Sequence, residues 1–275
     1  TTAVNIASSA RIDKSYFNKE SAAAVLAQVH QVMGNWADAS KYAKIAYGNN
    51  VATALDATAY RNGFNDMNAN KEWLLASPQS EDQSAYYWTA PFAFIDHTTT
   101  SYYATYINAD FVSKFSNTDV RNLFVASSTI TNPADFRRYT TRKFKFNFGS
   151  DVPLIRTAEM ILIDAEALAR TPGKEAEAHD LLYALQKNRD VNAVKSTNTG
   201  AALIDEILLE RRKELYAENG VEWFDAKRLR KGITRTGNHR IFKNLSADDK
   251  RFFLKVPQSE IDANESIDDT VNKDR

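Results

Sequence analysis

The 275-residue sequence has no cysteine and carries no formal net charge. The lack of cysteine excludes a disulfide scaffold and a cysteine-ligated zinc site. Because 35 basic residues balance 35 acidic ones, no long-range field would attract nucleic acid or an anionic membrane, and we expect no nucleic-acid partner. The remaining composition, 43% apolar and 25% charged, is typical of a globular protein.

Long hydrophobic runs are also missing. The best candidate, residues 152–168, is too short to span a bilayer and is interrupted by charged residues. The sequence starts at Thr1 without a charged-then-apolar signal segment, as a mature form or a fragment would. We expect a single domain over 1–275, divided into a helical hairpin (1–47), a loop-rich ligand region (48–152) and a helical region with a C-terminal tail (153–275).

Metal and phosphate sites are not indicated. The 9 glycines form no phosphate-cradling loop, and the 4 histidines have no metal-ligand spacing. Residues 66–70 imitate the start of a calcium loop, but the loop would lack its glycine at the sixth position and its acid at the twelfth, which is Ser77. We predict a turn there, no metal and no cofactor.

An enzyme is disfavoured for a similar reason. Glu159 and Glu166 lie seven residues apart on one helix face and could imitate the carboxylate pair of a glycosidase. Both fall within a helical core stripe, where a structural tie to arginine is the favoured interpretation. The sequence therefore predicts a protein without catalytic residues.

Residues 15–47 are predicted to form two helices that break at Gly34-Asn35. Apolar residues recur at helical spacing on both sides of the break: Ala22, Val25, Leu26, Val29, Val32 and Met33, then Trp36, Ala39, Tyr42, Ala43 and Ala46. Alanines at 23, 27, 39 and 43 would let the helices approach closely. This pattern resembles a hairpin of the tetratricopeptide type, although one unit is weak evidence for a repeat.

The middle of the chain has poor helical periodicity. We predict irregular loops over 48–152, with a short buried strand at 71–76 and a half-buried strand at 142–148, where polar residues alternate with phenylalanine. Residues 153–231 are helical again. Pro153 would occupy the first turn of the first helix, followed by helices at 176–189, 203–219 (ending at Asn219-Gly220) and 222–231. The polar tail after Asn264 is expected to fray.

A charged residue interrupts the apolar stripe of the helix at 203–219. Arg211 lies seven residues after Ile204 on that stripe, within pairing reach of Glu214 and Glu218. A buried arginine must be paired, so we predict a structural polar clamp formed by Arg211, Glu214, Glu218, Asp225 and Arg228. The alternative is that Arg211 extends past the core to water. The basic residues from Arg228 to Arg240 are interpreted as a solvated face.

Three blocks in this order resemble the SusD/RagB family. They are Pro153–Met160 with its continuation to Ala167, Glu210–Leu215 followed by Glu218, Trp223-Phe224-Asp225 and Arg228, and Val256–Asn264. The resemblance implies a mainly α protein with tetratricopeptide-like hairpins, long irregular loops and a few short strands. The chain would be a C-terminal portion or a short member, because a large N-terminal part of the family pattern, its lipid-anchoring cysteine and its Gln-Asn-Pro ending are absent.

The family resemblance also implies a function. Such proteins sit on the outer membrane surface of Bacteroidetes-type bacteria, held by a lipid anchor in the precursor. They capture oligosaccharide or polysaccharide, in some branches peptide, and pass it to a SusC-like TonB-dependent transporter. They are not enzymes. The alternative is a tetratricopeptide-like module that binds protein or peptide and no glycan.

The aromatic segment 81–106 is the best candidate for the ligand site. Sugar rings need aromatic faces, and sugar hydroxyls need planar polar side chains. The predicted ligand residues are Tyr86, Tyr87, Trp88, Phe92, Asp96, His97, Tyr102 and Tyr103, with Tyr106 and Asn108 at the end of the segment. Each ring taken singly is more often buried than ligand-binding, so the prediction concerns the segment as a whole.

Overall fold

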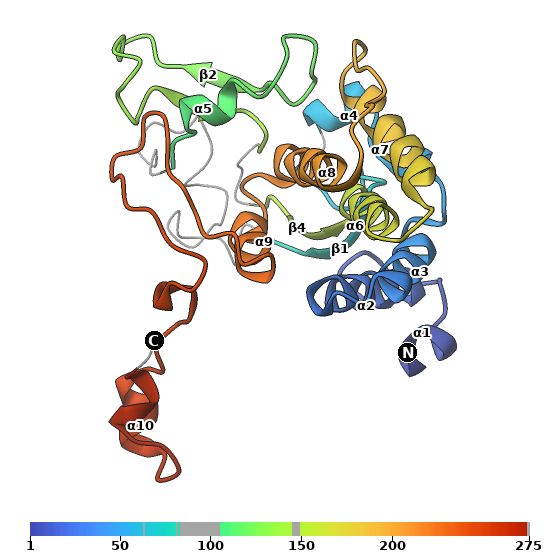
Figure 1. Cartoon of the computed structure of the whole chain (residues 1–275). Helices are drawn as coiled ribbons and strands as arrows, with labels where there is room; N and C mark the ends of the chain where they lie inside the picture. The colour runs from blue at the N-terminus through green and yellow to red at the C-terminus, as the bar shows by residue number, and fades with distance from the viewer. Residues whose placement is uncertain (63, 81, 83–104, 145–148, 274–275) are drawn as a thin grey trace.

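The computed structural model describes residues 1–62, 64–80, 82, 105–144 and 149–273. Helices predominate, so the prediction of a mainly α fold with a few short strands is confirmed (Figure 1). The helices are α1 Thr2–Ile6, α2 Lys19–Met33, α3 Trp36–Tyr47, α4 Ala57–Asn62, α5 Ala109–Val112, α6 Thr157–Ala169, α7 Glu175–Arg189, α8 Gly200–Leu215, α9 Val221–Arg228 and α10 Gln258–Ala263. The strands are β1 Trp73–Ser77, β2 Phe124–Ala126, β3 Tyr139–Thr141 and β4 Val152–Arg156.

The hairpin α2–α3 forms as the sequence predicts. The Asn18 and Ser21 side chains each accept a hydrogen bond from the other residue's backbone N–H, at 2.9 and 2.8 Å, which caps the start of α2. Gly34 ends the helix at a φ of +73°, a conformation that glycine adopts without strain. The alanines at 23, 27, 39 and 43 are fully buried between the helices.

The predicted apolar stripe of α2 is wrong in part: Ala22 and Leu26 pack against the core, but the other four members do not. Val25, Val29, Val32 and Met33 are exposed, the last two by more than 60%. The buried face carries small residues and Gln31, whose Nε2 donates to Glu166 Oε2 at 2.8 Å. The alanines occupy the buried face of α2 because their small side chains let the helices approach closely, and the larger valine and methionine side chains are exposed to solvent.

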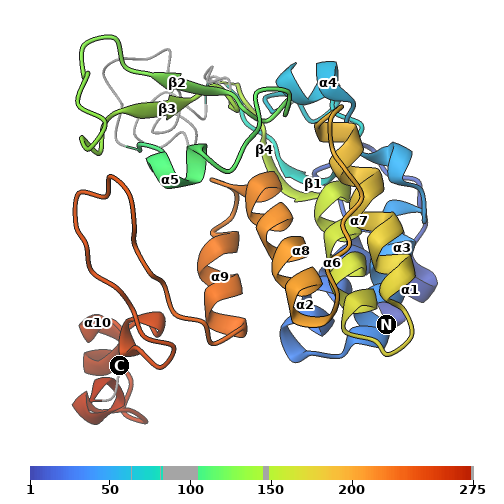
Figure 2. The same ribbon diagram turned by 45° about the horizontal axis from the view of Figure 1, so that its top comes forward.

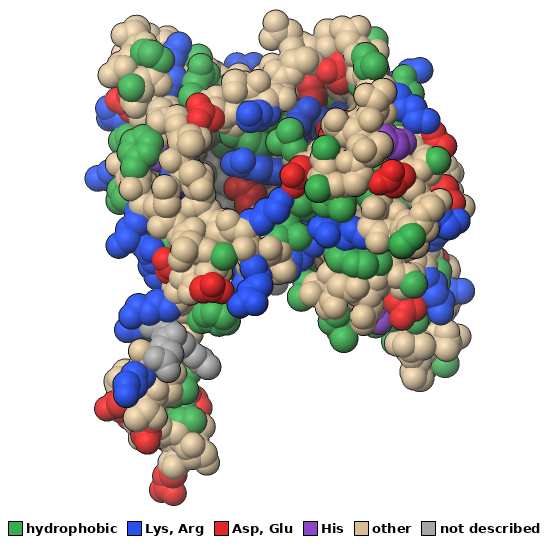
Figure 3. Space-filling model, in the orientation of Figure 1, with side chains coloured by type: hydrophobic (Ala, Val, Ile, Leu, Met, Phe, Trp, Pro, Cys, Tyr) green, Lys and Arg blue, Asp and Glu red, His purple; other side chains and the backbone are tan. Residues whose placement is uncertain are grey.

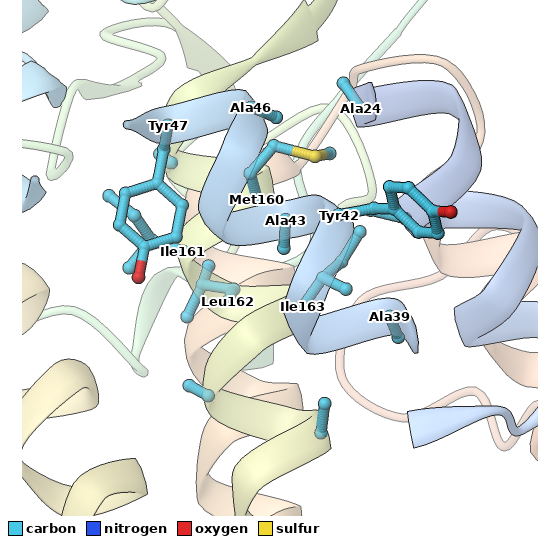
Figure 4. Close-up of a cluster of buried hydrophobic side chains, with 14 of the residues drawn as sticks. Ala24, Ala39, Tyr42, Ala43, Ala46, Tyr47, Met160, Ile161, Leu162 and Ile163 are labelled. Carbon is cyan, nitrogen blue, oxygen red and sulfur yellow. The ribbon is translucent and has the colours of Figure 1, made fainter. Parts of the chain in front are cut away.

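Helix α6 lies at the centre of the main core. All of its residues from Thr157 to Ala169 are buried. Figure 4 shows Met160, Ile161, Leu162 and Ile163 against the small side chains and the two tyrosines of α3. Its one acid facing α3, Asp164, accepts hydrogen bonds from Ser40 Oγ at 2.6 Å and Tyr47 Oη at 2.7 Å.

The strand β4 leads into α6 and corrects the role assigned to Pro153. Pro153 lies within β4, which pairs antiparallel with β1, and α6 begins four residues later at Thr157. Its partner across the sheet, Ala76, donates its N–H to Lys14 O at 3.0 Å instead. The missing N–H of proline therefore costs this two-stranded sheet little. The predicted strand at 71–76 is confirmed as β1.

Other boundaries also differ from the sequence predictions. The strand expected at 142–148 is absent from its described part, Arg142–Phe144, and the real strand β3 ends at Thr141. Helix α8 ends at Leu215, not at Asn219, and Gly220, at a φ of +68°, precedes α9. The tail is held near its end, because Asn272 exchanges two hydrogen bonds with the backbone of Val256 at 2.8 and 2.9 Å.

The segment 105–144 forms a second unit beside the helical layer. It holds α5 and the antiparallel pair β2–β3, in which Phe124 faces Thr141. Figures 1 and 2 both place this unit and the α2–α3 hairpin on opposite sides of α8. No helix among the described residues is long and apolar enough to cross a membrane.

Candidate functional site

A network of buried charges fixes the end of α8 against the strands. Arg156, from β4, donates to Glu214 Oε1 at 3.0 Å and to both oxygens of Glu218 at 2.8 Å, and it also pairs with Glu72. Arg189, from α7, donates to both oxygens of Glu214 at 3.0 Å. All of these side chains are buried, so each charge depends on its partners for compensation.

The same network reaches the segment 105–144. Arg121 binds both oxygens of Asp119 at 2.9 and 2.8 Å, and its Nη1 lies 2.5 Å from Glu210 and 3.1 Å from Glu214. Lys143 Nζ lies 2.5 Å from Glu218 Oε1. Buried ion pairs thus tie the middle of this segment to α8 and its end to Glu218, just after α8.

Lys143 and Arg156 also explain where α8 stops. Lys143 Nζ donates to the carbonyls of Glu214 and Tyr216 at 2.9 Å, and Arg156 Nη2 donates to the carbonyl of Glu214 at 3.0 Å. The last carbonyls of a helix lack partners within the helix. Here cationic side chains satisfy them, and the chain turns away at Tyr216 instead of continuing to Asn219.

Burial and pairing shift the pKa values in this network. Burial opposes ionisation of Glu214, but the charges of Arg189, Arg156 and Arg121 outweigh it and hold the pKa of this carboxyl well below its usual range. Burial lowers the pKa of Lys143 to about 8, although Glu218 favours the ammonium form. Glu214 and Glu218, with lowered pKa values, are therefore held in the charged form, whereas Lys143 loses its charge at mildly alkaline pH.

The predicted clamp residues divide between this network and a second one. Arg211 donates to Asp225 Oδ2 at 2.9 Å and to Glu159 Oε1 at 3.1 Å, so its predicted pairing with Glu214 or Glu218 is wrong. Arg228 donates to Asp225 Oδ1 at 2.7 Å and to the two carboxylate oxygens of Glu166 at 3.0 and 2.8 Å, so it links the two acids. Glu159 and Glu166 are thus tied to arginines, as expected.

An aromatic cluster completes the attachment of the loop unit. Ile107, Phe111 and Phe115 pack around Tyr216, the residue that leaves α8. The ring of Phe111 meets Tyr216 edge-on with centroids 5.5 Å apart, and Tyr216 Oη lies 2.9 Å from Thr141 Oγ1. The backbone that follows the aromatic segment 81–106 is therefore held rigidly against the helical layer.

Two cavities are candidates for a ligand site: one of about 380 Å³, lined by α8, α9 and the start of the loop after α9, and one of about 270 Å³, to which Tyr106 and Asn108 of this backbone contribute. Figure 3 shows the molecule hollowed between the α8–α9 part and the loop after α9, with charged side chains of both signs around the hollow. The larger cavity lies between these elements, and the ion pairs Arg212–Glu222 and Lys231–Asp205 join residues of its lining.

The smaller pocket has the chemistry of a ligand site. It is lined by Tyr106, Asn108, Phe136, Asn238, His239 and Arg240. The rings of Tyr106 and Phe136 meet edge-on at 5.7 Å, and the guanidinium of Arg240 lies over the Phe136 ring at 5.5 Å. Half-buried aromatic faces beside amide, imidazole and guanidinium groups can hold a ligand with both apolar and hydroxylated surfaces.

Two asparagines fix the walls of this pocket. Asn238 is buried; its Oδ1 accepts from Ala109 N at 2.7 Å and its Nδ2 donates to Asp135 O at 2.8 Å. Asn108 Nδ2 donates to Thr236 O at 2.8 Å. The loop after α9 and the segment 105–144 are thereby held together over a sequence separation of more than 100 residues.

The same contact requires glycine at position 237. Gly237 has a φ of +74°, and a Cβ there would lie 2.8 Å from Asn108 Oδ1 and 2.9 Å from Asp110 Cγ. Burial lowers the pKa of the neighbouring His239, and the charges of Arg235 and Arg212 lower it further. His239 is therefore neutral at neutral pH and can both donate and accept one hydrogen bond.

The predicted ligand residues Tyr86, Tyr87, Trp88, Phe92, Asp96, His97, Tyr102 and Tyr103 lie outside the described residues, and their role stays a prediction. Tyr106 and Asn108, at the end of that segment, line the pocket. Sequence reasoning missed Phe136 and Asn238 and assigned Arg240 to a solvated face. No local sequence pattern connects these distant positions.

The segment that imitates a calcium loop forms a turn. The Asp66 side chain accepts hydrogen bonds from the backbone N–H groups of Asn68 and Ala69. Among the described residues, no cluster of three or more His, Cys, Asp or Glu side chains is placed to hold a metal ion.

Comparisons with known proteins agree with the resemblance. The model of the SusD family matches residues 33–272. A SusD-like carbohydrate-binding protein from Bacteroides vulgatus superposes with a TM-score of 0.79 at 22% identity, over 96% of this chain and 60% of its own. A SusD superfamily protein from Bacteroides thetaiotaomicron gives 0.79 at 24% identity, over 94% and 60%. The chain thus spans about 60% of the length of these solved relatives. No curated protein matches the sequence.

Proposed function

Because this chain belongs to the SusD family, we propose that it is a cell-surface glycan-binding subunit of a nutrient importer. It captures oligosaccharide and presents it to a SusC-like TonB-dependent transporter in the outer membrane. The complete protein is held at that surface by a lipid anchor, and it binds its ligand without chemical change. The pocket between Tyr106 and Arg240 is where we place part of the ligand.

One observation carries this assignment. The pocket combines two aromatic rings with planar polar side chains on a backbone that is already fixed by buried asparagine contacts. Sugar rings have apolar faces that pack on aromatic rings and hydroxyl groups that bond to polar side chains. A site that exists before binding loses less entropy when the ligand arrives.

The test is oligosaccharide binding by calorimetry, comparing the wild-type protein with the double variant Tyr106→Ala/Phe136→Ala. Each aromatic contact is worth about 0.5–1.5 kcal/mol, so we expect affinity to fall about tenfold or more. The matched control is Tyr16→Ala/Phe17→Ala, which removes the same ring types from an exposed stretch before α2. Equal affinity in both double variants, with unfolding curves unchanged, would remove the pocket from the proposal.

The aromatic segment is tested separately. We expect Tyr87→Ala/Trp88→Ala to abolish oligosaccharide binding without unfolding the protein. Unchanged affinity would limit the site to the described pocket.

A protein- or peptide-binding module is the second candidate, and the exposed apolar face of α2 is the observation that favours it. This face carries Val25, Val29, Val32 and Met33 at helical spacing, as a surface for another helix would. Val29→Ser/Val32→Ser would then reduce binding of a peptide or transporter segment and leave glycan binding unchanged. Glycan binding by the wild-type protein, with no peptide bound, would reject this candidate.

A further inference from the structure

The pocket is lined by one arginine, Arg240, whose positive charge has no carboxylate partner among the described residues. Arg240 is exposed, and no carboxylate of the described residues lies within ion-pair distance of its guanidinium. It stacks on the Phe136 ring at 5.5 Å. Arg137 lies over the same ring at 5.5 Å but is bound by Asp135, with Nη2 to Oδ2 at 2.8 Å. The two arginines therefore differ in charge compensation while sharing one aromatic ring.

Other arginines near the pocket also lack an acidic partner among the described residues, so positive charge is in excess there. Arg235 donates to the carbonyl of Lys243, and Arg138, two residues after Phe136, donates to the carbonyls of Ser127 and Ile130. These bonds satisfy the donors but leave both positive charges in place. Of the nearby acids, Asp135 is bound by Arg137 and Glu222 by Arg212. Asp110, beside Gly237, forms no ion pair among the described residues and is an acid close to the pocket.

We propose that the pocket takes an acidic oligosaccharide, with the carboxylate of a uronic acid on the fork of Arg240 and a sugar face beside Phe136. The planar guanidinium matches a carboxylate with two parallel N–H···O bonds. Its stacking on Phe136 keeps the fork oriented before the ligand arrives. This inference rests on the proposed glycan-binding function and specifies its ligand class.

The experiment compares acidic oligosaccharides with neutral counterparts of the same backbone and length. Oligogalacturonides, glucuronoxylan fragments, alginate fragments and hyaluronan fragments are each paired with their carboxyl-reduced forms, and sulfated oligosaccharides form a separate arm. Calorimetry at low ionic strength is expected to give at least tenfold tighter binding of one acidic ligand than of its neutral counterpart. The difference should shrink at high salt, because exposed charges are screened.

Variants locate the effect. Arg240→Gln should weaken binding of the acidic ligand much more than binding of the neutral counterpart, so that the preference for the acidic ligand disappears. Arg240→Lys, which keeps the charge but loses the fork, should retain only part of the preference. Arg230→Gln is the matched control, because Arg230 is also exposed and pairs with Asp248 at 3.0 Å, away from the pocket lining. This control should bind like the wild-type protein.

The outcomes separate the two proposals. Equal binding of acidic and neutral partners by the wild-type protein would overturn the inference and leave the glycan-binding function standing. So would a preference that survives Arg240→Gln. A preference confined to sulfated ligands would also overturn the carboxylate assignment. Binding of none of these oligosaccharides would overturn both proposals.

Discussion

Glu214 is the carboxylate on which the buried charge network depends. It accepts hydrogen bonds from Arg121 at 3.1 Å, from Arg156 at 3.0 Å and from Arg189 at 3.0 Å to each oxygen. Glu214→Gln keeps the size and shape of the side chain but removes its charge. It also places an NH₂ group opposite guanidinium donors that need acceptors. Three buried cations then share fewer anions.

The expected cost follows from this geometry. Breaking a buried ion pair by removing one partner costs about 3–5 kcal/mol, since the other charge is left uncompensated. Glu214 serves three arginines, so we expect Glu214→Gln to reach the upper part of that range. Globular domains unfold with about 5–15 kcal/mol. The substitution should therefore remove a large fraction of the total stability while leaving the surface unchanged.

Urea unfolding followed by circular dichroism measures the effect. The control is Glu222→Gln, which removes the same charge from an ion pair with Arg212 in which both side chains are about half exposed. Such a surface pair is worth less than about 1 kcal/mol. A Glu214→Gln protein that is too unstable to fold would agree with the reasoning, and Glu218→Gln would then give a measurable, smaller loss.

The pH dependence gives an independent check. The pKa of Glu214 is lowered in the folded protein, so its contribution is complete above the unfolded value of about 4.3 and is lost as the pH falls towards the lowered pKa. The stability difference between wild type and Glu214→Gln should therefore be constant near neutral pH and shrink in acid. A loss no larger than that of Glu222→Gln would refute the account of the network.

Three further predictions concern other parts of the fold. Arg211→Met should change the free energy of unfolding, in either direction, and leave oligosaccharide affinity unchanged; a lower affinity in the folded fraction would contradict a purely structural role. Gly237→Ala should weaken ligand binding, because its Cβ would lie 2.8 Å from Asn108 Oδ1 at a φ of +74°; wild-type affinity in calorimetry would show that the pocket wall is not needed. Burial raises the pKa of Asp164, so the contribution of this residue to stability should decline as the pH rises from about 3.9 through the raised pKa. The stability difference between wild type and Asp164→Asn, measured by urea unfolding, should therefore change over that pH range, and a constant difference would contradict the prediction.

The sequence predicts those features of the fold that depend on local signals. Gly34 ends a helix because it adopts a left-handed conformation, and its neighbours need only local spacing to be recognised as helical. The face of α2 that is buried is not a local property. The closely packed alanines set it, and the larger Val32 and Met33 remain outside. Pro153 likewise fits a helix start or an edge strand, and only the pairing with β1 decides between them.

The candidate site is less predictable still. Arg211 could be recognised as buried from its stripe, but its partner Glu159 lies 52 residues away on another helix. The pocket brings together Tyr106, Phe136 and Asn238 from three separate parts of the chain. The residue spacing within one helix or strand gives no information about tertiary contacts between such distant segments. The family resemblance suggested a glycan as the ligand, and the aromatic content of 81–106 suggested where it would bind.

The attachment of the segment 105–144 has a consequence for how ligand preference can evolve. Its anchors, Arg121 and Lys143, are buried and do not line the pocket, whereas Phe136 is half-buried and Arg240 is exposed. Substitutions at such exposed positions usually change stability by less than about 0.5 kcal/mol. Residues such as Phe136 and Arg240 can therefore be replaced by residues of other charge or ring type with little loss in the free energy of unfolding. Under the proposed glycan-binding function, such changes would alter ligand preference without disturbing the buried charges.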